Sequence, residues 1–108
     1  MIDSAAAAEE IGISEESYKK LCSLFLETMK EDTAGLREAL STERRKDIRS
    51  LAHHIKGAAA NLDFMTLSIK AEELQKAADD EDMELLRLKA DLLLEEYKKI
   101  QISIEEIL

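Results

Sequence analysis

Two adjacent histidines are the residues of this chain best suited to chemistry, because a neutral imidazole offers a nucleophilic nitrogen near physiological pH. They are His53 and His54, within the segment AHHIKGAAANL that spans residues 52–62. Lys56 and Gly57 follow within one helical turn. A lysine can stabilise the oxygens of an anionic group, and a glycine leaves room for a large partner. The segment therefore predicts a reactive imidazole that faces something both anionic and large.

Helical spacing distinguishes the two histidines. With Ile55 at the centre of the buried line and about 100° per residue, His53 falls about 160° from that line and His54 about 100° from it. We expect His53 to face solvent and His54, on the flank of the helix, to be a boundary or surface residue. The surface beyond His53 carries only Gly57 and Ala60, so a partner could approach closely. Because a glycine within a helix costs about 0.5–1 kcal/mol relative to alanine, its presence indicates a packing or access requirement.

Each of these features also has an ordinary interpretation. A single exposed histidine is usually an incidental surface residue. Here the exposed imidazole coincides with a cation three residues on, a glycine four residues on and a run of small residues, which favours a functional role. A run of basic residues is usually a solvated helix face, but in an acidic chain we expect such a run to help an acidic partner to dock. The basic residues near the histidines are Arg44, Arg45, Lys46 and Arg49.

The composition is typical of a single helical domain. The chain has 108 residues, no proline and three glycines, and it is rich in Ala, Leu, Glu and Lys. With 15 basic and 24 acidic residues, its net charge of −9 argues against nucleic acid or an anionic membrane as a partner. The single cysteine, Cys22, is interpreted as a small buried hydrophobe in a reducing compartment. No segment reads as a signal peptide or a membrane span, so we expect a cytoplasmic monomer.

Apolar periodicity and capping residues predict five helices joined by short loops. We expect Ser4 and Ser14 to cap the first two helices, Gly12 to end the first, and Thr66 to cap the fourth. The acidic run at 79–82 is interpreted as a solvated turn with an N-cap, because it lacks the glycine and the ligand spacing of a calcium loop. The predicted helices cover residues 4–11, 15–41, 47–62, 66–78 and 83 to near the end of the chain.

Three details of the predicted core can be tested directly. The inward series of helix 15–41 includes Leu21 and is interrupted by the polar pair Asp32 and Thr33. The inward series of the last helix includes Leu88 and Leu92.

Helices joined by short loops pack antiparallel. The sequence thus predicts an all-α fold over residues 1–108 as one domain, with a short N-terminal helix in 1–13 and an antiparallel, up-down-up-down four-helix bundle in 14–108.

Residues 52–59 resemble the signature of histidine-containing phosphotransfer (HPt) domains. In that signature an alanine and a histidine precede one free position, which is followed by an aliphatic residue, a lysine, a glycine and a small residue. The resemblance makes His53 the phosphorylated residue and His54 the free position. Gln75 matches a Gln or Glu that in some members orients the imidazole. The sequence departs from the family at Asp63, where a second glycine is common.

The resemblance implies a phosphorelay carrier. His53 would accept a phosphoryl group from an aspartyl phosphate on one receiver domain and pass it to the aspartate of another, with Lys56 stabilising the phosphoryl oxygens. The expected partners are receiver domains of response regulators, with a hybrid sensor histidine kinase as a further candidate. The chain should need no cofactor of its own, and Mg²⁺ is expected on the receiver. The expected partner-contact residues are Arg49, Gly57, Ala60 and Phe64.

The sequence supports two other functions less well than phosphoryl transfer. A helical adaptor could bind a signalling partner without phosphoryl transfer, but the presence of both the histidine and the lysine disfavours this. A metal-binding bundle would need inward-facing Glu-x-x-His pairs, whereas the two histidines here are adjacent and do not face inward. No phosphate-binding glycine motif is present, so use of ATP is not expected and the chain is interpreted as a carrier rather than an enzyme.

Overall fold

A computed structural model describes all 108 residues, and it is built entirely from helices and short connections. The helices form an elongated bundle with extents of 42 × 19 × 19 Å. Their bounds are α1 Ser4–Ile11, α2 Glu15–Ser41, α3 Arg45–Asn61, α4 Met65–Ala77 and α5 Met83–Ile107.

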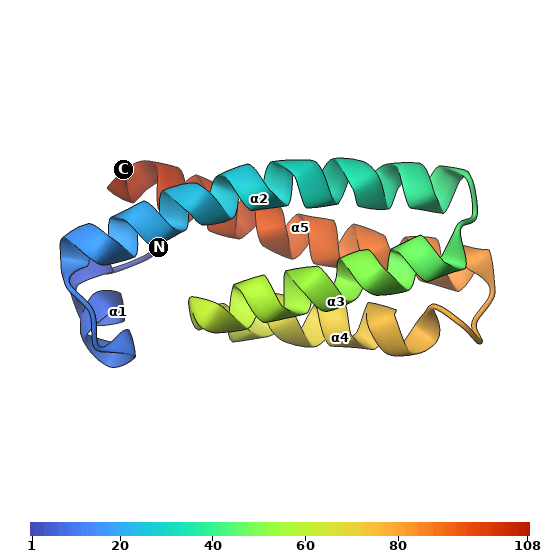
Figure 1. The fold of residues 1–108 in the computed structure, drawn as a ribbon, viewed down its shortest axis with the longest axis horizontal. Helices are drawn as coiled ribbons and strands as arrows, with labels where there is room; N and C mark the ends of the chain where they lie inside the picture. The colour runs from blue at the N-terminus through green and yellow to red at the C-terminus, as the bar shows by residue number, and fades with distance from the viewer.

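The four longer helices run antiparallel to their neighbours in sequence, and the chain order is also the order around the bundle (Figure 1). Helix α2 packs against α3 and α5, and α4 packs against α3 and α5. Helix α1 packs against α2 at the end of the bundle where both termini lie (Figure 1). The predicted all-α bundle with an additional N-terminal helix is confirmed.

Three helices end in the same hydrogen-bonded motif, which requires one residue in the left-handed conformation. These residues are Gly12 (φ 87°), Glu43 (φ 54°) and Asp63 (φ 61°). After α3, the Asp63 N–H donates to the carbonyl of Ala60, and the Phe64 N–H donates to that of Ala59. Glycine adopts this conformation at no steric cost, whereas Glu and Asp do so at some cost, which the closed motif offsets. This motif turns the chain sharply between helices.

The N-caps of the helices agree only in part with those predicted from the sequence. Ser14 and Asp82 are the N-caps of α2 and α5, and their side chains accept hydrogen bonds from backbone N–H groups three residues on. The prediction of Ser4 as the first cap is wrong, because Asp3 caps α1 by accepting from the Ala6 N–H. Helix α3 begins two residues before the predicted start. Helix α4 begins at Met65 with no side-chain cap, so Thr66 does not have the predicted role.

The core runs the length of the bundle and contains residues from every helix. Three leucines predicted to face inward are exposed instead: Leu21 (41%), Leu88 (56%) and Leu92 (45%). Conversely, the polar pair Asp32 and Thr33 is buried. Helical spacing gives the centre of a buried face but not its width, which depends on how neighbouring helices cover the flanks.

The end of the core near α1 is closely packed. Phe25 contacts Phe64 and Tyr97, with ring centroids 5.3 and 6.1 Å apart. Burial, with a hydrogen bond to Cys22, raises the pKa of the Tyr18 hydroxyl, and burial raises the pKa of the Cys22 thiol. Cys22 is fully buried, as predicted. No helix combines the length and the apolar character that a membrane span requires.

Candidate functional site

His53 lies in the middle of α3, on the face of the helix that points away from the core. Ala52 and Ile55, which flank the two histidines in sequence, are completely buried and fix the rotation of the helix. His53 is exposed, as its spacing from Ile55 predicted. The hydrogen bonds and ion pairs of the structure include His54 but not His53. The imidazole of His53 therefore has no intramolecular partner to displace.

His53 lines a hollow of about 440 Å³ between α2 and α3. The α2 wall is partly apolar, and two of its leucines are unusually exposed for their size, Leu21 at 41% and Leu24 at 57%. The lining residues are Leu21, Leu24, Phe25 and Thr28 of α2 and His53, His54, Gly57, Ala58, Asn61 and Leu62 at α3. An exposed histidine beside exposed apolar side chains is an arrangement suited to protein docking.

His54 turns toward α2 and has a fixed partner there. Its Nδ1 lies 2.5 Å from Oδ2 of Asp32, a residue 22 positions earlier in the chain. The Asp32 side chain is only 12% exposed, whereas that of His54 is 60% exposed. A buried carboxylate needs a donor, and His54 supplies it. His54 is thus an exposed residue, as predicted, but it also links α2 to α3.

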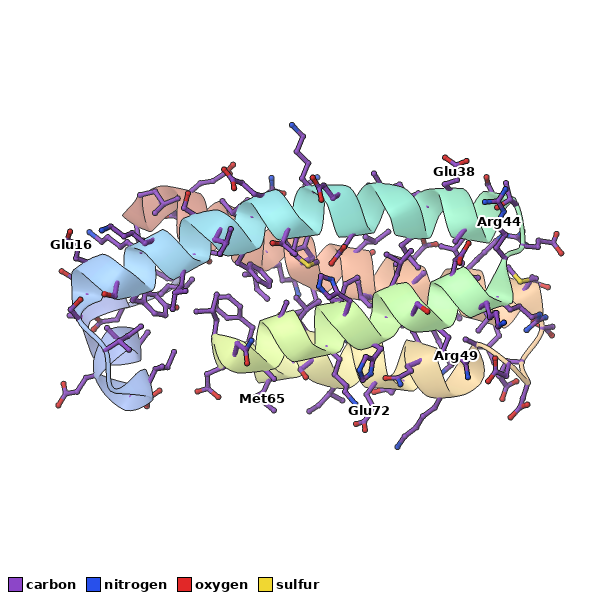
Figure 2. The ribbon with its side chains drawn as sticks, viewed as in Figure 1. Glu16, Glu38, Arg44, Arg49, Met65 and Glu72 are labelled. Atoms are coloured by element: carbon purple, nitrogen blue, oxygen red, sulfur yellow. The ribbon has the colours of Figure 1, made fainter.

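Lys56 points toward α4, where its ammonium meets a carboxylate. Its Nζ lies 4.0 Å from Oε1 of Glu72, and the same oxygen lies 3.8 Å from Nζ of Lys76. Glu72 projects from α4 on the side of the molecule away from α2 (Figure 2). On the same flank, the Ser68 hydroxyl donates to the backbone carbonyl of Lys56 at 3.0 Å. The Lys56 side chain is 32% exposed and so retains access to solvent.

Gly57 and Ala60 leave the surface next to His53 bare, and both are exposed. A Cβ added at Gly57 would meet no atom within 4 Å. At Gly35 of α2, by contrast, a Cβ would meet the side chain of Leu51 at 3.4 Å. The packing of this chain therefore gives no reason for the glycine at position 57.

Of the four basic residues near the start of α3, Arg45 and Arg49 have partners within the molecule, whereas Arg44 and Lys46 are exposed. Arg45 donates to the carbonyls of Ala78 and Glu81 at 3.0 and 2.6 Å, which ties α3 to the α4–α5 connection. Arg49 is exposed and lies 3.5 Å from Asp79 (Figure 2). Of the predicted contact residues, Arg49 is accessible but already partly neutralised.

Two other residues of the predicted site form no hydrogen bond or ion pair with His53. Phe64 is half-buried against Phe25, and it lines a separate hollow next to α1 instead of the one that holds His53. The amide oxygen of Gln75 on α4 is buried and has no hydrogen-bond partner. No group of three or more His, Cys, Asp or Glu side chains is placed to hold a metal ion.

Comparison with known families shows which family the chain belongs to. A family model described as Hpt domain matches residues 20–102, which is most of the chain and includes all of α3 and α4. The chain belongs to the Hpt domain family. No curated protein and no solved structure matches the chain. Hpt domains carry phosphoryl groups on histidine in phosphorelays, and their partners are receiver domains.

Within this Hpt domain, the structure explains the departure at Asp63. The residue has a φ of 61°, in the conformation that glycine adopts most readily. Aspartate is among the few other residues that tolerate it. A glycine at this position would suit the helix ending, and Asp63 adopts the required conformation in its place.

The α2 wall of the hollow that contains His53 was not predicted from the sequence. Leu21 was assigned to the core, Leu24 was not considered, and Asp32 was treated as a break in the apolar pattern. One usable signal was present, because Leu21, Leu24 and Thr28 share one helix face by their spacing of three and four residues. No signal linked Asp32 to His54, since that pairing depends on the register of two antiparallel helices.

Proposed function

We propose that His53 is the phosphoacceptor of this Hpt domain and that it carries a phosphoryl group between the aspartates of two receiver domains. The observation that carries the proposal is the exposed, unpaired imidazole of His53 in a hollow next to Gly57, a glycine that nothing in the chain's own packing requires. A helix that accepts this glycine gains access for a second protein at the cost of helix stability.

The chemistry needs little from this chain. A neutral imidazole has one ring nitrogen with a free lone pair, which attacks the phosphorus of an aspartyl phosphate in line. The P–N bond forms as the P–O bond breaks, and the receiver's carboxylate leaves with the electron pair. The reverse step returns the phosphoryl group to the aspartate of a second receiver. The carrier has to present the nitrogen and stabilise charge, while Mg²⁺ and its ligands belong to the receiver.

Lys56 is the cation proposed to stabilise the phosphoryl oxygens. In the free protein its ammonium lies near Glu72, at a distance and exposure typical of a weak surface ion pair. A phosphoryl group on His53 carries more negative charge than one carboxylate, so it can draw Lys56 away. Lys76 remains beside Glu72 when this happens. The lysine is therefore available for the reaction although it is paired at rest.

Gln75 is proposed to orient the imidazole by accepting a hydrogen bond from its protonated nitrogen. What supports this is the buried, unpartnered amide oxygen of Gln75, because a buried acceptor without a donor is costly. Movement of the two side chains toward each other on receiver binding would provide that donor.

The receiver is proposed to dock over the seam between α2 and α3. The hollow there offers apolar contacts from Leu21 and Leu24 within the same cavity as His53. Interfaces of this kind place apolar anchors at the centre and polar residues at the rim. An adaptor without phosphoryl chemistry could use the same surface, and the two functions differ only in whether phosphate reaches His53.

The proposal is tested by incubating the protein with a phosphorylated receiver domain from the same genome. We expect acid-labile, base-stable phosphate on the wild-type protein, none on His53→Gln, and retention on His54→Gln. Label on His53→Gln would overturn the site assignment. A receiver that binds the wild-type protein and leaves it unlabelled would support the adaptor instead.

A further inference from the structure

His54 differs from His53 in being held by another helix, although both line the same hollow. The Asp32 side chain that holds it is 12% exposed and has His54 as its hydrogen-bond partner. Because an ionised carboxylate can only accept, the hydrogen of this bond belongs to Nδ1 of His54. A neutral imidazole carries one hydrogen, so Nε2 of His54 is left as an acceptor.

The two residues of the pair have very different exposure. Asp32 is buried in the wall of the bundle, whereas the His54 side chain is 60% exposed and reaches the hollow. On the far side of the pair, the seam between α2 and α3 opens again into a second hollow that contains Gly35, Ser50 and Leu51. The pair therefore forms the border of the hollow that contains His53, where a docked protein would meet a polar group.

We infer that the Asp32–His54 pair is a specificity determinant for the receiver. Asp32 fixes the tautomer of His54, and His54 then presents Nε2 as an acceptor to an N–H or O–H donor on the docked receiver. His54 takes no phosphoryl group in this scheme and acts as a docking residue, while Asp32 acts through it as a positioning residue. The inference rests on the proposed function, since it concerns how the receiver of that reaction is recognised.

The tautomer is measured without any partner. At pH 8, where an ordinary imidazole is neutral, ¹⁵N chemical shifts of the His54 ring should show hydrogen on Nδ1 and none on Nε2. His53, which has no partner, should show the usual mixture of tautomers. Hydrogen on Nε2 of His54 in the wild-type protein, as the other tautomer or as an imidazolium, would overturn the inference.

Docking is measured with Asp32→Asn, because an asparagine amide can donate to Nδ1 and so move the ring hydrogen to Nε2. We expect the receiver concentration that gives half-maximal transfer to rise about three- to tenfold, the worth of one hydrogen bond between neutral groups. The maximal transfer rate should stay within about twofold of wild type. Phosphorylation by phosphoramidate, a small donor that needs no docking, should not change.

The matched control is Thr33→Ala. Thr33 is the next residue of α2, is equally buried, and donates only to the carbonyl of Lys30 in its own helix. It should lose some stability without altering the half-maximal receiver concentration. If Asp32→Asn and Thr33→Ala behave alike toward the receiver, the pair is only a structural link and the inference is wrong. If even the wild-type protein takes no phosphate from the receiver, the proposed function fails and this inference fails with it.

Discussion

His53 and His54 are neighbours in the chain, yet the two flanks of α3 on which they lie are built differently. On the His54 side, a short hydrogen bond to a buried carboxylate links α3 to α2. On the His53 side, the imidazole has no partner, and Lys56 and Glu72 on that flank form a loose and partly exposed pair. One flank is fixed and the other is left free.

The difference shows how a carrier can present a reactive group without holding it. Contacts to His53 within the chain would have to be broken before a receiver could reach it, so the free flank lowers the cost of docking. The fixed flank links α2 to α3 at the border of the hollow. His54 contributes to stability, and the adjacent His53 is left accessible to a partner. No single residue has to do both.

The largest difference between the two flanks is expected in the free energy of unfolding when each histidine is replaced. His54→Ala should lower the free energy of unfolding by about 1–3 kcal/mol, because it leaves the buried Asp32 carboxylate without its donor. His53→Ala should change it by less than about 0.5 kcal/mol, as for an exposed residue without contacts. Urea unfolding of the two variants measures both values. Equal losses would mean that the Asp32–His54 bond is not formed in solution.

A smaller effect is expected from the loose ion pair, and it concerns transfer. Lys56→Ala should slow phosphorylation of His53 about tenfold, since a cation facing the transferred group is removed. Glu72→Gln should act in the opposite direction by releasing Lys56, and should have no effect when Lys56 is already alanine. Single-turnover transfer from a labelled receiver measures these rates. An unchanged rate in Lys56→Ala would show that the lysine is only a surface charge.

The smallest effect is expected at the bare surface next to His53. Gly57→Ala should stabilise the protein by about 0.5–1 kcal/mol, because the added Cβ meets nothing in the chain, and yet it should slow transfer from a receiver. Thermal unfolding and transfer rates measured on the same sample separate the two outcomes. Gly35→Ala is the control, since its Cβ would contact Leu51 on the same seam and leave the His53 surface unaltered. A faster transfer in Gly57→Ala would contradict the proposed role of the glycine.

Much of the fold could be predicted from the sequence, because it depends on short-range signals. Ser14 and Asp82 begin helices where cap residues predict, and Gly12 ends one with the expected positive φ. The exposure of His53 followed from its spacing relative to Ile55, since the angle between two side chains on one helix is fixed by geometry.

What could not be predicted depends on contacts between helices. The exposure of Leu21 follows from how α3 lies against α2, and the burial of Asp32 follows from its bond to His54, 22 residues away. Neither can be read from the periodicity of one helix. The loose ion pair of Lys56 with Glu72 likewise depends on the register of α3 and α4. The sequence thus located the proposed phosphoacceptor but not the α2 wall of the hollow beside it.

The most direct test of the account is to locate the phosphoryl group on one of the two adjacent histidines. The wild-type protein would be labelled by a phosphorylated receiver, digested under alkaline conditions that preserve phosphohistidine, and fragmented by electron-transfer mass spectrometry. We expect the added mass on His53, with His54 unmodified. Phosphate on His54, or on neither histidine of a protein that carries label, would contradict the central claim that the free flank of α3 is the one that reacts.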